Sequence, residues 1–118
     1  MPHCIVEYST DLEERFNPSV LVDLVYQGAF SSKLFEGPDI KIRALPYVYY
    51  QTGERKQAFI HVSIRLLEGR TQDKKMKLSN LVLEKLTLLD LEQTSLTVEI
   101  IDIERASYAK KLVEDTFL

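Results

Sequence analysis

A strand–helix–strand pattern occurs twice in succession along this chain, and this repetition constrains the fold more than any other feature. The first unit spans about residues 2–45 and the second about residues 58–104. Two strands joined through a helix lie parallel in one sheet, and the crossover is almost always right-handed. The repeat therefore predicts an α+β fold, in which a four-stranded mixed sheet carries two helices on one face.

Alternation of apolar and polar side chains predicts the strands. The clearest is 58–66, where every second side chain is aliphatic. The other strands are expected at residues 3–8, 40–44 and 95–103. Pro46 disfavours a central strand at that point, so residues 47–50 are interpreted as an edge extension that leads into a turn.

Capping residues and helical spacing predict the helices. Asn17 and Pro18 indicate a helix start, because Asn can cap free amides and Pro is tolerated at the first helical position. Gly28 is expected to end that helix. A turn at 68–71 opens a longer helix, whose apolar stripe consists of Leu78, Leu81, Val82, Leu86 and Leu89. Residues 107–118 are expected to form a short tail, for which a helix is one option.

Length and composition narrow the class of protein. One domain is the expectation for 118 residues, and a net charge of -3 without a long basic block argues against nucleic-acid binding. Cys4 is the only cysteine, which excludes an intramolecular disulfide and a cysteine-based zinc cluster. The absence of a disulfide framework favours a reducing, cytoplasmic setting, and Cys4 is expected to be a small buried residue of the first strand. Acidic residues enter the amino-terminal segment too early for a signal peptide, and no apolar stretch is long enough to span a bilayer.

Pro2 is the first candidate for chemistry. Removal of Met1 would convert it to a secondary amine, and burial or nearby cations would shift that amine towards its neutral, basic form at pH 7. By itself the feature is weak, since Pro at the second position is common in proteins that make no use of it.

Three cations could hold an anionic substrate. Lys41 and Arg43 point the same way from one strand, although an isolated pair of this kind is more often a solvated face. Arg70 lies in the turn before the second helix, and its alternative interpretation is an exposed loop residue. His61 is not assigned a catalytic role, because a lone His in an alternating strand is more often packed or hydrogen-bonded. No metal-ligand cluster or nucleotide-binding motif is present.

Several segments together resemble a known family. These are the opening Met1–Glu7 (MPHCIVE), Ile40–Arg43 (IKIR), Ala58–His61 (AFIH) and Gly69–Thr71 (GRT) before a long helix. They are similar to the 5-carboxymethyl-2-hydroxymuconate Δ-isomerase family of the tautomerase superfamily, over nearly the whole chain to about residue 103. A compared member of the family has Arg where this chain has Lys41. Lys is a point charge without a bidentate fork, so this departure bears on the identity of the substrate more than on the type of reaction.

The resemblance implies a homotrimer of tandem strand–helix–strand subunits that works without metal or coenzyme. It implies that Pro2 is the general base and acid, and that Lys41, Arg43 and Arg70 bind substrate carboxylates. The expected activity is enol–keto isomerisation of an unsaturated carboxylate such as 5-carboxymethyl-2-hydroxymuconate, in aromatic-compound catabolism. The alternatives are a decarboxylase or dehalogenase of the same superfamily, and a non-catalytic ferredoxin-like module that binds a small molecule or oligomerises.

Overall fold

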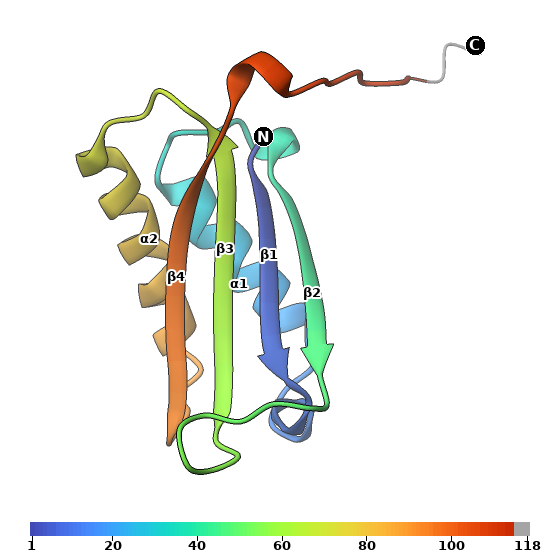
Figure 1. The fold of residues 1–118 in the computed structure, drawn as a ribbon, viewed down its shortest axis with the longest axis vertical. Coiled ribbons are helices and arrows are strands. Elements are labelled where there is room, and N and C mark those ends of the chain that lie inside the picture. Colours follow the sequence, from blue (N-terminus) through green and yellow to red (C-terminus); the bar gives the residue numbers. More distant parts are fainter. Residues whose placement is uncertain (115–118) are drawn as a thin grey trace.

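Two helices pack side by side on one face of a four-stranded sheet in the computed structural model, which describes residues 1–114 (Figure 1). The strands are β1 (His3–Ser9), β2 (Lys41–Tyr47), β3 (Ala58–Leu67) and β4 (Thr94–Ile103), and the helices are α1 (Ser19–Ser31) and α2 (Gln72–Thr87). The sheet order is β2-β1-β3-β4. Each strand–helix–strand unit contributes a parallel pair, and β1 joins β3 antiparallel. The predicted mixed sheet with both helices on one face is confirmed.

The core lies between the sheet and the helices. Every second residue of β3 from Ile60 to Leu66 is buried, as the alternation predicted. The core side chains that meet across this layer are Cys4, Val6, Ile60, Val62, Ile64 and Leu66 from the sheet, and Leu21, Val25, Leu78, Val82 and Leu86 from the helices. Burial of this apolar surface is the main stabilising term for the fold.

The helices begin next to the predicted capping residues, but Pro18 is the N-cap residue of α1 and not its first helical residue, which is Ser19. The side-chain oxygen of Asn17 accepts a hydrogen bond from the Ser19 amide at 2.9 Å. The Thr71 hydroxyl accepts one from the Lys74 amide at 3.2 Å and caps α2. Each bond satisfies an amide that has no partner within its helix.

The prediction that Gly28 ends the first helix is wrong, because α1 continues to Ser31. Gly28 is buried where α1 crosses α2, and a Cβ atom there would lie 2.8 Å from the Cα of Val82. The glycine therefore permits a close approach of two helices rather than a helix end.

The chain departs from expectation at two further places. β2 runs through Pro46 to Tyr47, which an edge strand tolerates, whereas residues 48–50 are not part of the strand. The carboxyl-terminal segment makes one 3-10 turn at Arg105–Ser107, and residues 108–114 have no regular secondary structure, so no α-helix forms in the described tail. The rest of the expected tail, residues 115–118, lies outside the described residues.

One face of the sheet has no helix over it, and we call it the open face. On β3 it presents Phe59, His61, Ser63 and Arg65. The 1–114 segment contains no helix with the length and apolar character needed to cross a membrane.

Candidate functional site

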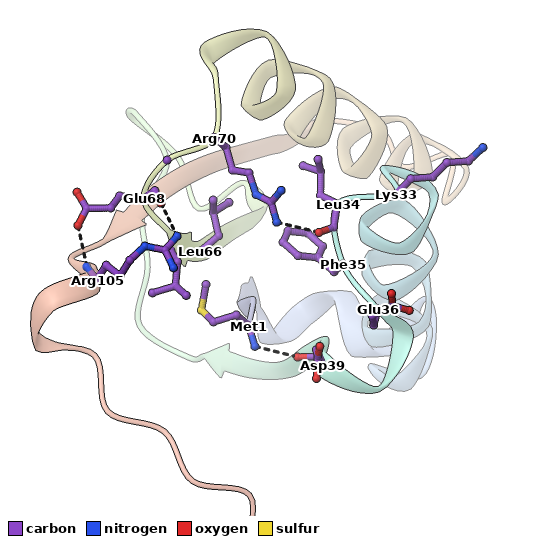
Figure 2. A pocket seen from close by; sticks show the side chains of 12 residues that line it. Met1, Lys33, Leu34, Phe35, Glu36, Asp39, Leu66, Glu68, Arg70 and Arg105 are labelled. Atoms are coloured by element: carbon purple, nitrogen blue, oxygen red, sulfur yellow. Dashed lines mark hydrogen bonds between the residues drawn. The ribbon is translucent and has the colours of Figure 1, made fainter.

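A pocket of about 500 Å³ opens at one end of the sheet (Figure 2). At this end β1 and β2 begin and β3 and β4 end, as Figure 1 shows. Its walls come from four parts of the chain: Met1, the segment after α1 that includes Phe35, the β3–α2 turn that includes Arg70, and Arg105 after β4. The fold therefore brings the amino terminus together with two guanidinium groups that are far apart in the sequence.

The amino terminus is partly buried in this pocket. The Met1 amine donates to the Asp39 carbonyl at 3.3 Å, and the Lys41 ammonium donates to the same oxygen at 3.1 Å. Burial, followed by the hydrogen bond and charge of Lys41, lowers the pKa of the Met1 amine below its ordinary value of 8.0. The adjacent Pro2 ring is fully buried, and the Pro2 carbonyl accepts from the Lys41 amide at 3.0 Å.

Arg70 reaches the same pocket from the turn that opens α2. Its guanidinium donates to the Leu34 carbonyl at 2.9 Å and lies 5.9 Å from the centre of the Phe35 ring. In Figure 2 it extends over the pocket towards the loop that carries Leu34 and Phe35. These contacts fix the position of the group without neutralising its charge, so it can still bind an anion.

The structure places Lys41 and Arg43 outside the pocket wall, on exposed parts of β2. Lys41 lies next to the amino terminus, because both groups donate a hydrogen bond to the Asp39 carbonyl oxygen. Arg43 lies further along the strand, where its guanidinium is 3.4 Å from Nδ1 of His3. Of the three predicted cations, Arg70 is the one that lines the pocket with Met1.

His3 connects β1 to the carboxyl-terminal segment. Its Nε2 is 3.0 Å from the Tyr108 hydroxyl, and the two rings meet edge to face. Burial and then the charge of Arg43 lower the pKa of His3 below its usual 6.5. A neutral imidazole is therefore favoured beside the amino terminus at pH 7.

Arg105 was not identified from the sequence, although it lines the pocket. Its backbone amide donates to the Glu68 carboxylate at 2.7 Å, and its guanidinium donates to the Glu68 carbonyl at 2.9 Å. No local pattern marks it, because it lies in an irregular segment after β4 and reaches the pocket only through these contacts with the β3–α2 turn.

Two other groups considered in the sequence lie elsewhere. His61 is on the open face, where its ring nitrogens contact Thr97 at 2.7 Å and Glu99 at 2.5 Å. Cys4 is fully buried, and burial raises the pKa of its thiol to about 12. Within residues 1–114, no group of three or more His, Cys, Asp or Glu side chains is arranged to hold a metal ion.

Comparison with known proteins gives the family. The family model described as 5-carboxymethyl-2-hydroxymuconate isomerase matches residues 2–115. No curated protein matches the sequence.

Solved structures agree in fold. The chain is similar to a 5-carboxymethyl-2-hydroxymuconate isomerase from Deinococcus radiodurans R1, with 25% identity and a TM-score of 0.77 over 93% of this chain and 88% of that one. A 5-carboxymethyl-2-hydroxymuconate delta-isomerase gives 16% identity and a TM-score of 0.81 over 96% and 89%. A fused 4-OT protein described as a symmetric trimer is 16% identical, with a TM-score of 0.73 over 92% of this chain and 90% of that one. With its mixed sheet and a family match over nearly its whole length, the chain belongs to the 5-carboxymethyl-2-hydroxymuconate isomerase family and is an isomerase of the tautomerase fold.

Proposed function

We propose that the chain catalyses enol–keto isomerisation of an unsaturated carboxylate such as 5-carboxymethyl-2-hydroxymuconate. In this proposal Met1 is removed and the Pro2 nitrogen becomes the general base and acid, without a metal or cofactor. The observation that carries it is that Met1 itself forms part of the wall of a pocket that Arg70 and Arg105 also line. Loss of Met1 would open that space and expose the Pro2 nitrogen to it.

The surroundings of the amino terminus suit a base that is neutral at pH 7. The pKa of the Met1 amine is already lowered by burial and by Lys41. The Pro2 ring is more deeply buried than Met1. A Pro2 amine would experience the same two effects, and both disfavour its protonated form.

The proposed reaction consists of two proton transfers. The neutral Pro2 amine takes the proton from the 2-hydroxyl of the substrate, which leaves a dienolate and a protonated amine. The dienolate oxygen forms the ketone as the conjugated double bonds shift and their electron pair bonds the returned proton. The protonated amine then returns a proton to a carbon further along the conjugated system. Arg70 would stabilise the negative charge that develops on the dienolate oxygen or bind a carboxylate, and Lys41 and Arg43 would bind further carboxylates.

Intact mass spectrometry and a kinetic assay test the proposal. The purified protein is expected to lack Met1, and ultraviolet absorbance should follow ketonisation of 2-hydroxymuconate. Pro2→Ala keeps a removable Met1 but supplies a primary amine, and it should lower kcat by about 10²-fold or more if the amine is the general base. Retained Met1, or equal rates for both proteins, would reject the role of Pro2.

We also propose that three copies assemble through the open face. Its strands present half-buried apolar side chains such as Ile5 and Phe59 that no helix of the described chain covers. A similar fold occurs in the fused 4-OT protein that is described as a symmetric trimer. Packing of sheets around a shared axis would remove this surface from water.

A further inference from the structure

We infer that Arg105 is a second carboxylate-binding residue of the pocket, and that it gives the site a preference for dicarboxylates over monocarboxylates. This inference deepens the proposed function and rests on it. The observation behind it is that two guanidinium groups, Arg70 and Arg105, line one pocket from separate segments of the chain, with Met1 beside them (Figure 2).

Arg105 is held in position by Glu68 through two bonds. The Glu68 carboxylate accepts from the Arg105 backbone amide at 2.7 Å, and the Glu68 carbonyl accepts from the guanidinium at 2.9 Å. Gly69 follows with a φ of 118°, and a Cβ atom there would lie 3.8 Å from Nη2 of Arg105. The guanidinium is thus seated over the β3–α2 turn, so less conformational entropy would be lost when it binds an anion.

The two guanidinium groups retain their charge. In the described part of the chain, the ion pairs are His61–Glu99 and Lys75–Asp102, and neither arginine belongs to one. Each arginine side chain instead donates one hydrogen bond to a backbone carbonyl. A guanidinium has five N–H donors, so each group keeps enough donors for a bidentate carboxylate.

The carboxylates of the pocket wall do not remove this positive character. Glu68 uses its carboxylate on the Arg105 amide and points outward in Figure 2. Glu36 and Asp39 belong to the opposite part of the wall, on the other side of Met1 from Arg105. A ligand with one carboxylate at Arg70 and another at Arg105 would therefore lie in the pocket that Met1 also lines, where we propose that the proton transfer takes place.

Two unreactive probes test the inference by isothermal titration calorimetry. trans,trans-Muconate and sorbate share the same conjugated carbon chain, but muconate has two carboxylates and sorbate has one. Arg105→Gln is expected to weaken muconate binding about tenfold or more, because a charge-assisted hydrogen bond is lost, and to leave sorbate binding within twofold. Arg105→Lys should restore part of the muconate affinity.

A matched control is Arg55→Gln, which removes an exposed arginine from a turn outside the pocket and should leave both affinities unchanged. Equal losses for both probes, or no loss for muconate, in Arg105→Gln would overturn the inference. Neither probe carries the 2-hydroxyl, so their binding does not depend on proton transfer by Pro2. Failure of the proposed isomerase activity would appear instead as absent turnover of 2-hydroxymuconate with muconate binding intact.

Discussion

At the scale of single residues, the amino terminus and its neighbours decide what the chain can do. The Met1 amine, Lys41 and the Asp39 carbonyl meet at one point. His3 lies beside them, between Arg43 and Tyr108. Burial and surrounding positive charge favour neutral nitrogen atoms here, which is the condition that base catalysis near pH 7 requires.

The lowered pKa of His3 predicts a pH-dependent stability. The folded state binds the His3 proton less readily than the unfolded state, whose pKa is near 6.5. The free energy of unfolding should therefore fall as the pH drops through 6.5 towards the folded pKa. His3→Gln removes this effect. Between pH 8 and pH 5 the free energy of unfolding, measured by urea denaturation, should therefore decrease less for the variant than for the wild type.

The other histidine, His61, is present in both proteins, and its contribution cancels in the comparison. The same decrease in wild type and His3→Gln would contradict the assignment of a lowered pKa to His3.

The sequence could point to a residue that lies next to an element with a clear pattern. Arg70, in the turn before α2, lines the pocket, whereas Pro2 is buried and only its neighbour Met1 lines it. The roles of Pro2 and Arg70 stay predictions. Arg105 could not be found in this way, because its position depends on hydrogen bonds to Glu68 across 37 residues. Lys41 and Arg43 lie in one strand as predicted, but the pocket opens beyond the start of that strand and not along its face.

At the scale of elements, the contact between α1 and α2 depends on Gly28. A Cβ atom at Gly28 would lie 2.8 Å from the Val82 Cα, which is backbone and cannot move cheaply. Gly28→Ala should therefore lower the free energy of unfolding by about 1 kcal/mol or more, since overpacking costs about 1–3 kcal/mol and the gain in helix propensity offsets part of it. Urea denaturation measures the difference.

Gly37→Ala is the matched control. A Cβ atom at Gly37 would lie 2.7 Å from the Tyr26 hydroxyl, which is the far end of a flexible side chain. This variant should change stability less than Gly28→Ala. Equal effects of the two variants would show that close helix packing is not the reason for glycine at position 28.

The elements were predictable to the extent that each has one buried face. The alternation in β3 marked that strand almost to its ends. The stripe on α2 marked the helix less closely, because it starts at Leu78, and its last predicted member, Leu89, lies beyond the helix end at Thr87. The helix end predicted at Gly28 was wrong because glycine is common both at helix ends and where two helices pack closely. Only the position of Val82 in the structure distinguishes the two cases. The order of the strands in the sheet was likewise not readable from the sequence, because it depends on pairing between distant segments.

At the scale of the whole molecule, the open face is the surface that an assembly would cover. Leu45 lies there on the edge strand β2 and is 49% exposed. Sedimentation equilibrium should give a mass three times that of the 13.7 kDa chain, and Leu45→Asp should shift the protein towards monomer because a charge would be buried between copies.

Met76→Asp is the control, because Met76 is 61% exposed on α2 and lies away from the open face. It should leave the mass unchanged. A wild-type monomer, or dissociation by Met76→Asp as readily as by Leu45→Asp, would contradict assembly through the open face.

The central claim concerns the whole site: a freed Pro2 nitrogen in this pocket is neutral near pH 7. Nitrogen-15 NMR of protein labelled at its four prolines tests it, with a peptide of residues 2–8 as the reference. One proline nitrogen should titrate as a terminal amine, with a midpoint below that of the peptide and low enough that the neutral form predominates at pH 7. If no proline nitrogen titrates, or if the amine stays mainly protonated at pH 7 as in the peptide, the claim is contradicted.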